Sequence, residues 1–484
     1  MSLGQLLTAI SINDLDDAAS AIVINDLVID SRNVTGGSLF CAYPGSRADG
    51  RDFIQQALQA GAAAVICEAE GFAEHPQPAV PIIMVTDLKH KIGIVADHFF
   101  SSPSTEMQVF GVTGTNGKTT CCYLLTQALT ELGLRAVMIG TIGAGNLAEL
   151  SYSHLTTPDP VALQRQLAEW RDQGITQVCM EVSSHALDQG RVAGTQFFCT
   201  MFTNLTHDHL DYHGNMERYA AAKLCLFTEH PSELVITNLD DEFGASLIEL
   251  ANSDFIASYG SGGDVAVVRT ELAADGMTLT LQANGMTFMV GASLIGKINV
   301  PNILLLVTTL LSLSTSVEDI QRIVAQLTPA PGRMELFSNE RQARVVVDFA
   351  HTPDALEKAL KSVREHCVGQ LWCVFGCGGD RDKAKRAVMG AAAAQHADRI
   401  VVTNDNPRSE APEMIAKDIL AGINNSVVVE LDRAKAIRTA IKQAASDDWI
   451  LVAGRGHEPT QHIGEKHLPF SDREHVAKLL RIAA

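Results

Sequence analysis

The sequence predicts an α/β fold divided into three domains. Its 484 residues are about three times the roughly 150 residues of one typical domain core. In the last third of the chain, short apolar runs alternate with segments of helix length, as in a parallel sheet covered by helices. Earlier, one apolar run leads into a glycine-rich loop and then into a helix-forming segment. We expect domains over residues 1–87, 88–331 and 332–484.

Composition and charge argue against several classes of protein. With 46% hydrophobic and 19% charged residues the chain has a globular balance. A net charge of -19 argues against a broad surface for nucleic acid or anionic membranes. The N-terminus carries no basic segment ahead of an apolar run, and the longest apolar run, Ile303 to Leu313, is too short to span a bilayer. The ten cysteines form no paired C-x-x-C knuckle. We expect a monomeric cytoplasmic protein with reduced thiols and no nucleic-acid or membrane partner.

The first expected domain has the pattern of a small α/β sheet. A helix-like stretch runs from Arg51 to Ala60. Short apolar runs of strand length stand on both sides of it, at Leu27 to Ile29, Leu39 to Ala42, Ala63 to Cys67 and Ile82 to Val85.

The second expected domain combines a mostly parallel sheet with an antiparallel patch. Apolar runs, with helical stretches between some of them, predict the parallel strands at Val109 to Val112, Val178 to Val182, Phe197 to Phe202 and Leu234 to Ile236. Between Asp264 and Val290 the pattern alternates instead. The pairs Asp275-Gly276 and Asn284-Gly285 predict hairpin turns there, because such turns need positive φ.

The third expected domain is a doubly wound, Rossmann-like sheet. Its regular apolar runs are each followed by a helix-length segment, and they lie at Val345 to Asp348, Leu371 to Phe375, Ile400 to Thr403, Val427 to Glu430 and Ile450 to Ala453. Ligands of such sheets bind beyond the carboxyl ends of the strands. The loops after these strands are therefore candidates for a binding site.

The loop after Val112 carries the strongest functional signal. It reads Gly114, Thr115, Asn116, Gly117, Lys118, Thr119 and Thr120 and precedes the helical run Tyr123 to Leu132. Glycines let backbone N–H groups approach phosphate oxygens, Lys118 would meet the β- and γ-phosphates, and Thr119 would ligate Mg2+. The strict spacing of this motif fails by one, because Gly111 lies six residues before Gly117. The context favours nucleoside triphosphate binding over a plain glycine turn.

Polar residues that follow other predicted strands add weaker signals. Glu181 ends an apolar strand, the usual place for a second Mg2+ contact, although it could merely face solvent. The segment Thr206 to His213 concentrates three histidines and two aspartates, which suggests either a polar loop or a hydrolytic metal site with one histidine displaced. Lys223 alone would be a solvated helical lysine. Arg408, in Asp405-Asn406-Pro407-Arg408, offers a fork for a carboxylate but could also be a surface residue.

Taken in order, these motifs resemble the Mur ligase superfamily over nearly the whole chain, and among its members those that add meso-2,6-diaminopimelate to a UDP-activated muramoyl dipeptide. The resemblance rests on Asp30-Ser31-Arg32, Gly114 to Thr120, Thr156 to Pro160, Glu181 to His185, Asp208 to Asp211, Lys223, Asn299, Asn302, Gly332-Arg333, Asp348 to His351, Asp405 to Arg408 and Gly454 to Glu458. Departures from the family pattern are small, at Asn404, Phe349 and Leu155.

The resemblance implies a role for each matching residue. Binding of the uridine nucleotide is implied for Ile29, Ser31, Ser46, Arg47 and Ala48. Binding of the muramoyl dipeptide is implied for Leu155, Thr156, Thr157, Ser183, Gln189 and Arg191. Contacts with ATP beyond the loop are implied for Asn299, Asn302, Arg333 and Asp348, and an amino-acid pocket for Arg386, Asp405, Asn406, Pro407, Arg408, Gly454 and Glu458. Mg2+ would be placed by Thr119, Glu181, His209 and Lys223, the last as a carbamate.

The implied reaction belongs to peptidoglycan precursor synthesis. ATP phosphorylates the γ-carboxylate of D-glutamate, and the amine of diaminopimelate attacks the acyl phosphate. Lys118, Glu181, His209 and Lys223 would be the catalytic residues. Two rivals share the phosphate loop: a folylpolyglutamate synthetase, which does not account for Asp405 to Arg408, and a nucleotide switch or motor triggered by a macromolecule. A metallohydrolase would act without ATP.

Overall fold

A four-stranded parallel sheet begins the chain in this computed structural model, which describes residues 1–45, 48–72, 80–153, 155–339, 341–424 and 426–482. Its strands lie in sequence order: β1 (Asp26–Val28), β2 (Ser38–Ala42), β3 (Ala64–Glu68) and β4 (Ile82–Val85). Apolar side chains of α1 (Leu3–Thr8) and α4 (Leu88–Phe99) pack on one face, and those of α3 (Ile54–Gln59) pack on the other. The four apolar runs of this region therefore form the strands predicted for them.

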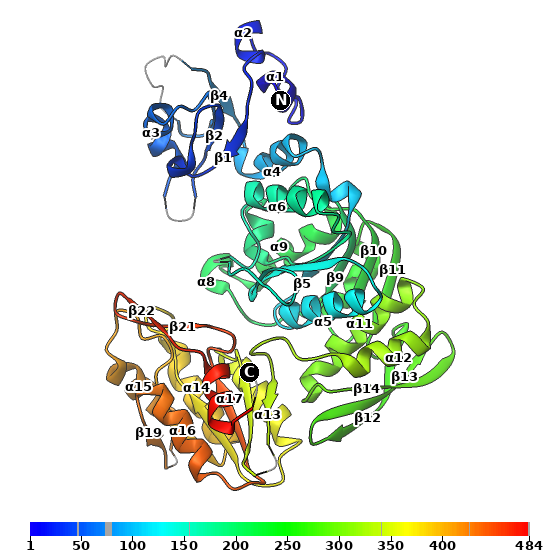
Figure 1. Cartoon of the computed structure of the whole chain (residues 1–484), viewed down its shortest axis with the longest axis vertical. Coiled ribbons are helices and arrows are strands. Elements are labelled where there is room, and N and C mark those ends of the chain that lie inside the picture. Colours follow the sequence, from blue (N-terminus) through cyan, green and yellow to red (C-terminus); the bar gives the residue numbers. More distant parts are fainter. Residues whose placement is uncertain (46–47, 73–79, 154, 340, 425, 483–484) are drawn as a thin grey trace. The chain divides into compact units, whose positions relative to one another are not determined.

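The described residues form two compact units, which Figure 1 traces along the chain. The first unit holds Met1–Lys118 and Leu129–Ala257, and the second holds Thr119–Ala128 and Ser258–Ala484. The chain passes from one unit to the other within α5 (Lys118–Glu131) and within β11 (Ser253–Tyr259).

The first unit contains a second, larger sheet around the phosphate loop. Its strands lie in the order β10 (Ser232–Asn238), β9 (Phe197–Phe202), β5 (Gln108–Thr113), β8 (Gln177–Glu181), β6 (Ala136–Gly140) and β7 (Gly143–Gly145). All neighbouring pairs are parallel except β6 and β7. Because the strands are parallel, the residues that follow β5, β8 and β9 gather at one edge of this sheet.

Helices of the first unit bury their apolar sides against this larger sheet. Leu163 and Leu167 of α6 (Pro160–Asp172) share one core with Leu226 of α9 (Met216–Thr228) and Leu247 of α10 (Glu242–Leu250). The short helices of this unit are α2 (Asp17–Ser20), α7 (Ser184–Asp188) and α8 (Leu210–His213). The helices pack against strand residues such as Val109 and Val178, which is why these strands read as continuous apolar runs in the sequence.

The antiparallel patch is present in the second unit, but one of its turns differs from the prediction. The strands β12 (Val265–Ala273), β13 (Gly276–Ala283) and β14 (Met286–Ala292) pair in sequence order. Asn284 and Gly285 form the second turn with φ of 50° and 73°, as predicted. The first turn lies one residue earlier, at Ala274 and Asp275, without positive φ. Gly276 is instead needed for space, since a Cβ there would lie 2.3 Å from the Ala292 carbonyl oxygen.

The C-terminal sheet confirms the doubly wound prediction. Its order is β15 (Glu335–Phe337), β16 (Arg344–Asp348), β20 (Trp449–Ala453), β17 (Leu371–Phe375), β18 (Arg399–Val402) and β19 (Val428–Val429), with only β15 antiparallel. One face packs against α13 (Pro353–Arg364), α14 (Ala384–His396) and α15 (Pro412–Leu420). The other face packs against α16 (Arg433–Gln443) and α17 (Asp472–Leu480) (Figure 1).

The remaining elements of the second unit are two helices and a hairpin. Helix α11 (Val300–Ser312) contains most of the longest apolar run and is buried within its unit, and α12 (Val317–Gln326) follows it. The hairpin consists of β21 (Thr460–Ile463) and β22 (Lys466–Pro469). Across the part of the chain that the structure describes, no helix is both long and apolar enough to cross a membrane.

Candidate active site

The phosphate loop is shaped by two glycines in conformations that other residues rarely adopt. Gly114 has a φ of +145° and Gly117 a φ of +89°. A Cβ on Gly114 would lie 1.9 Å from the Thr203 Oγ1 atom, so no larger residue fits there. The loop thus passes close against the residues that follow β9. The predicted strand-loop-helix arrangement is present, with α5 beginning at Lys118 itself.

Side chains beyond β9 hold the loop in place. The Thr203 hydroxyl and the Asn204 amide both donate hydrogen bonds to the Asn116 carbonyl, at 2.7 and 3.1 Å. The Asn116 amide N–H in turn donates to Asn204 Oδ1 at 3.0 Å. Thr115 Oγ1 accepts from the Thr206 amide N–H at 2.9 Å and contacts the Tyr219 hydroxyl at 3.1 Å. These contacts with the residues after β9 therefore define the shape of the loop.

Two lysines meet at one carbonyl of this loop. Lys118 Nζ and Lys223 Nζ each donate to the Gly114 carbonyl oxygen at 2.8 Å. Lys223 is only 1% exposed, so it is not the solvated helical lysine that its sequence context alone would predict. Burial first, and the neighbouring charge of Lys118 second, lower the pKa of Lys223 well below its usual value, while Asp208 acts in the opposite direction. The amine of Lys223 is therefore driven toward its neutral, nucleophilic form.

Glu181 is a buried carboxylate at the end of β8. It is 1% exposed, and its two oxygens accept hydrogen bonds from the Thr141 amide N–H at 2.7 Å and the Thr141 hydroxyl at 3.1 Å. A Cβ on Gly140 would lie 2.3 Å from Glu181 Oε1, so Gly140 leaves the space that this carboxylate occupies. The alternative of a strand-end glutamate facing solvent is thereby excluded.

A cluster of aromatic rings surrounds His185, which follows Glu181 in the motif. The ring centroids of His209 and Tyr212 lie 4.9 and 4.2 Å from that of His185. Burial, and then His209 and His213, lower the pKa of His185 to about 4, so this imidazole is neutral at pH 7. The pKa of His209 is also lowered, chiefly by burial.

The same cluster does not support the hydrolytic metal site. His213 is buried and its Nε2 pairs with the Ser184 hydroxyl at 3.0 Å. Within the described ranges, no three histidine, cysteine, aspartate or glutamate side chains gather in an arrangement that could hold a metal ion. The three histidines of Thr206 to His213 are all described: His209 and His213 lie in ring contacts with His185, and His207 is exposed.

Residues predicted to hold the muramoyl dipeptide lie together beside Glu181. The Thr157 hydroxyl donates to the Glu181 carbonyl at 2.8 Å and accepts from the Ser183 amide N–H at 3.1 Å. Thr156 Oγ1 lies 3.1 Å from the Thr141 hydroxyl. Arg191 donates from Nη1 to the Thr157 carbonyl at 2.9 Å.

Gln189 belongs to the same group, and Leu155 lies beside Thr156 in the sequence. Arg191 also donates from Nε and Nη2 to Gln189 Oε1, at 3.1 and 2.6 Å. Leu155 is 41% exposed and belongs to the same segment as Thr156. Leu155 hydrogen-bonds to the Ser153 hydroxyl instead, whereas the other predicted dipeptide residues are joined in one hydrogen-bonded group.

The predicted uridine site is only partly described. Ser31 is buried, and its hydroxyl donates to Gln56 Oε1 at 3.0 Å. Ile29 packs against the core of the first sheet. Ala48 is exposed, and its carbonyl accepts from the Gly45 amide N–H at 2.9 Å. Ser46 and Arg47 lie outside the described residues.

In the second unit, the residues predicted to contact ATP are buried (Asn299 and Asn302) or half-buried (Arg333 and Asp348), and all are hydrogen-bonded. Asn302 donates to Asn299 Oδ1 at 3.0 Å, and Asn299 donates to the Ile295 carbonyl at 2.8 Å. Arg333 stacks 4.4 Å above the ring centroid of Phe349 and reaches the Thr119 hydroxyl at 3.3 Å. The Asp348 carboxylate accepts from the backbone, and burial raises its pKa, while Arg333 acts in the opposite direction.

Residues predicted to form the amino-acid pocket lie together around the loop after β18. Asn406 donates to Glu458 Oε2 at 2.8 Å and accepts from the His462 amide N–H at 2.9 Å. A Cβ on Gly454 would lie 2.5 Å from Asp405 Oδ2, so only glycine leaves room for that carboxylate. Burial, then the nearby charge of Asp405, raises the pKa of Glu458. These contacts bring together residues that are about 50 positions apart in the sequence.

The backbone of Arg408, in this loop, has a left-handed conformation with a φ of 50°. Its Nη1 donates to the Gly379 carbonyl at 2.7 Å, and its backbone N–H donates to the His462 carbonyl at 3.1 Å. Pro407 contributes its carbonyl, which accepts from the Glu410 amide N–H at 3.1 Å. The arginine fork is thus held between the loop after β17 and the β21–β22 hairpin.

Arg386, also predicted for this pocket, is fully buried and occupied by ion pairs. Its guanidinium donates to both oxygens of Glu410, at 3.0 and 2.8 Å, and to Asp418 at 2.9 Å. Glu410 in turn accepts from the Asp380 amide N–H at 2.7 Å. Arg386 therefore braces the loop that follows β17. Arg381 on the same loop is exposed and was not predicted as a site residue. Its Cγ lies 3.7 Å from the position that a Cβ on Gly378 would take.

Replacing Arg386 by alanine should destabilise the protein. The substitution leaves the Glu410 and Asp418 carboxylates without their buried cation, and we expect the midpoint of thermal unfolding to fall by about 5 °C. Calorimetry would measure the shift. The matched variant Arg381→Ala should leave the midpoint unchanged, and equal midpoints for both variants would contradict the bracing role of Arg386.

Two further buried arginines, Arg433 and Arg455, contact the neighbouring segments and were not predicted as site residues. Arg433 and Asp472 are both almost fully buried and form two hydrogen bonds of 2.7 Å. Arg433 also donates to the carbonyls of Asn404 and Ala453, which precede Asp405 and Gly454. Arg455 donates to the Thr460 carbonyl at 2.6 Å. No local motif marks the contacts of Arg433, because they join residues far apart in the chain.

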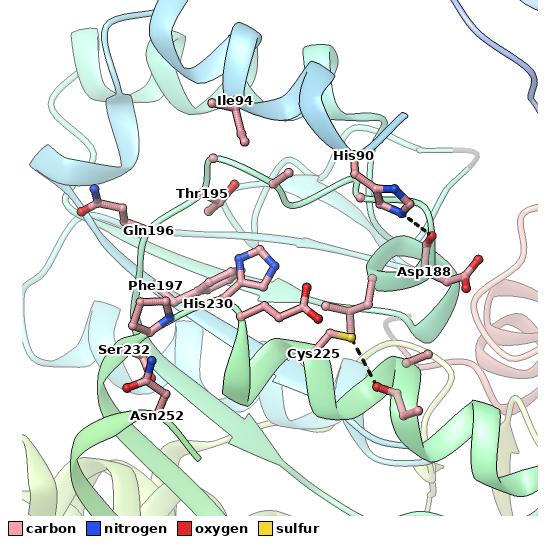
Figure 2. A pocket seen from close by; sticks show the side chains of 18 of the residues that line it. His90, Ile94, Asp188, Thr195, Gln196, Phe197, Cys225, His230, Ser232 and Asn252 are labelled. Carbon is pink, nitrogen blue, oxygen red and sulfur yellow. Dashed lines mark hydrogen bonds between the residues drawn. The ribbon is translucent and has the colours of Figure 1, made fainter. Parts of the chain in front are cut away.

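A large cavity lies elsewhere, in the first unit. It has a volume of about 1560 Å³ and opens near Phe197 and Ser232, the first residues of β9 and β10 (Figure 2). The phosphate loop follows the carboxyl end of β5, so it belongs to the opposite edge of the parallel sheet. This cavity is therefore separate from the phosphate loop.

Three comparisons with known proteins bear on this arrangement. The chain matches the Mur ligase family, catalytic domain, over residues 23–100, the Mur ligase middle domain over residues 112–310, and the Mur ligase, glutamate ligase domain, over residues 332–456. A UDP-N-acetylmuramoyl-L-alanyl-D-glutamate--2,6-diaminopimelate ligase of Coxiella burnetii is 45% identical over 469 residues, which are 95% of this chain and 96% of that protein.

Two solved structures resemble the fold of this chain. A structure of a UDP-N-acetylmuramoyl-L-alanyl-D-glutamate--2,6-diaminopimelate ligase is 33% identical, covers 99% of both chains and gives a TM-score of 0.72. Folylpolyglutamate synthase of Mycobacterium tuberculosis is 19% identical, covers 74% of this chain and 91% of its own, and gives a TM-score of 0.59. That second likeness extends to the fold alone.

Proposed function

The chain belongs to the Mur ligase family, and from this premise we propose that it is the ATP-dependent ligase that adds meso-2,6-diaminopimelate to UDP-N-acetylmuramoyl-L-alanyl-D-glutamate. The main support is the relative of this name that matches 95% of the chain at 45% identity. The folylpolyglutamate alternative is the weaker one, since that enzyme resembles the chain only in fold.

The proposed reaction brings a nucleoside triphosphate, a carboxylate and an amine together. The backbone N–H groups of the loop after Gly114 and the ammonium of Lys118 would bind and neutralise the transferring phosphoryl group. Oxygen donors suit Mg2+, which usually takes one or two carboxylates together with phosphate oxygens and water. The buried Glu181 carboxylate and the Thr119 hydroxyl fit this preference, and the His209 imidazole would be a nitrogen ligand beside them. When bound, Mg2+ would offset the negative charge of the phosphates.

We further propose that Lys223 is carbamylated. Carbamate formation joins the neutral lysine amine to CO2 and releases a proton, so a lowered pKa favours it. Lys223 has a lowered pKa because of burial and of the Lys118 charge. The product would place a negative group beside Lys118 instead of a second ammonium, and this anion would be a further oxygen donor for Mg2+.

The precursor and the amino acid would meet the residues already described. Arg191 and Gln189 would hold the anionic dipeptide, with Thr156, Thr157 and Ser183 beside them. Arg408 would receive the distal carboxylate of diaminopimelate as a charge-assisted fork. Because Arg386 is buried in ion pairs, the exposed Arg381 is the better candidate for a second cationic contact.

The function predicts phosphate release that depends on both small substrates. Purified protein given ATP and Mg2+ should release phosphate only when the UDP-muramoyl dipeptide and meso-diaminopimelate are both present, and the tripeptide product should appear in equal amount. Phosphate detection combined with chromatography of the nucleotide precursor measures this. Phosphate release triggered by a macromolecule would favour a nucleotide switch, and turnover without ATP would favour a hydrolase.

The organisation of the chain follows from this function. We propose that residues 1–87 bind the uridine nucleotide, residues 88–331 bind ATP, and residues 332–484 bind the amino acid. We also propose that the enzyme works as a monomer in the cytoplasm, where ATP and UDP-linked precursors are available, and that it serves cell-wall growth and division.

A further inference from the structure

Helix α4 and the segment that carries Gln189 and Arg191 touch backbone to backbone. A Cβ on Gly93 of α4 would lie 2.3 Å from the Ala193 carbonyl oxygen. Gly190 and Gly194 face the helix in the same way, with Cβ positions 2.9 Å from His90 Cα and 2.7 Å from the Gly93 carbonyl oxygen. The three glycines therefore allow a contact closer than side chains permit, and α4 forms one wall for the segment from Gly190 to Gly194.

His90 of α4 adds a polar contact with Asp188, just before Gln189. Its Nδ1 lies 2.6 Å from Asp87 Oδ1, and its Nε2 lies 3.1 Å from the Asp188 carbonyl oxygen. Figure 2 shows the His90 ring turned toward Asp188, with this contact drawn as a dashed line. His90 thereby ties the residue before Gln189 to α4.

Tyr212 is hydrogen-bonded to both Asp188 and Gln189. Its hydroxyl donates to Asp188 Oδ2 at 2.6 Å and accepts from Gln189 Nε2 at 3.0 Å. The other end of the Gln189 amide, Oε1, accepts two hydrogen bonds from Arg191. Arg191 completes the chain at the Thr157 carbonyl. The orientation of the Arg191 guanidinium is thus connected to the Tyr212 hydroxyl through a single side chain.

We propose that His90 and Tyr212 are positioning residues that hold Gln189 and Arg191 in the orientation that receives the UDP-muramoyl dipeptide. The inference rests on the proposed function, which assigns Gln189 and Arg191 to that substrate. Neither residue is a core residue, since Tyr212 is 39% exposed and the His90 side chain is 47% exposed. Their hydrogen bonds therefore order the site more than they stabilise the fold.

Two single substitutions separate positioning from stability. Tyr212→Phe keeps the ring on His185 and removes the hydroxyl, and His90→Ala removes both polar contacts of the imidazole. Each should raise the KM and the Kd for the UDP-muramoyl dipeptide about five- to tenfold, as expected for the loss of one hydrogen bond to a charged or polar partner. The KM for ATP, the KM for diaminopimelate and the unfolding midpoint should stay at wild-type values.

A matched control and a double-mutant cycle complete the test. His98→Ala changes another histidine of α4 that has no recorded contact with Gln189 or Arg191, and it should leave the Kd unchanged. In a Gln189→Ala background, Tyr212→Phe should have little further effect, because the hydroxyl acts through Gln189. Additive effects, or an unchanged precursor Kd in both single variants, would overturn the inference. Failure of the wild-type protein to bind the precursor would overturn the proposed function instead.

Discussion

Replacing Arg408 by methionine should remove the preference for meso-diaminopimelate over lysine. The two amino acids differ by one distal carboxylate, and Arg408 is the arginine fork held beside the Gly379 carbonyl. A charge-assisted pair of this kind contributes about 1.5 to 3 kcal/mol. We therefore expect kcat/KM for diaminopimelate to fall roughly 10- to 100-fold, while the low value for lysine changes little.

Steady-state kinetics with both amino acids checks this expectation. Arg399→Met is a suitable control, because Arg399 is an exposed arginine at the start of β18. That variant should keep the wild-type ratio of the two kcat/KM values. An unchanged ratio in Arg408→Met would show that the distal carboxylate is recognised elsewhere, for example by Arg381.

Replacing Lys223 should have a still larger effect on turnover. Lys223→Ala removes the amine that we propose to be carbamylated, and Lys223→Arg keeps a cation that forms no stable carbamate. Both variants should lose roughly 10²- to 10³-fold in kcat, the scale seen when one group that stabilises transition-state charge is removed. Lys358→Ala, an exposed lysine of α13 paired with Asp354, should retain full activity.

Native mass spectrometry tests the chemical state of the same residue. The wild-type protein should carry the added mass of one CO2 molecule, and that mass should disappear in Lys223→Ala and on acidification, because protonation of the amine reverses carbamate formation. Full activity in Lys223→Arg would contradict the proposal, since arginine supplies only the positive charge.

The sequence predicted the elements whose signal is local. Buried parallel strands such as Phe197–Phe202 are continuous apolar runs. The helix after the phosphate loop was predicted from the helical run Tyr123 to Leu132. Strands without such a signal were missed, and so was β6, although Ala136–Gly140 is a buried apolar run. β7 consists of Gly143, Ala144 and Gly145, and β22 is exposed along its whole length, so neither resembles a buried strand. The Asp275-Gly276 turn was misplaced because a glycine needed for space looks the same as one needed for positive φ.

The residues of the candidate site also divide into those that a local motif predicts and those that only the fold brings together. The residues of the phosphate loop, Glu181 and Arg408 stand in recognisable motifs at strand ends. Interactions that join distant segments leave no such trace: Arg433 with Asp472, or Tyr212 with Asp188 and Gln189, are paired only by the fold. Arg386 illustrates another case, since the family resemblance implies a contact with the amino acid, and the structure shows its completely buried guanidinium in ion pairs with Glu410 and Asp418.

The bracing of Asn116 by Thr203 and Asn204 has a thermodynamic consequence. Because those side chains already occupy the Asn116 carbonyl, the phosphate loop is ordered before any nucleotide arrives. Nucleotide binding then loses little conformational entropy at the loop, and this preorganisation raises affinity without adding a contact to the ligand. Thr203 and Asn204 would therefore influence ATP affinity through the loop, without contacting the nucleotide themselves.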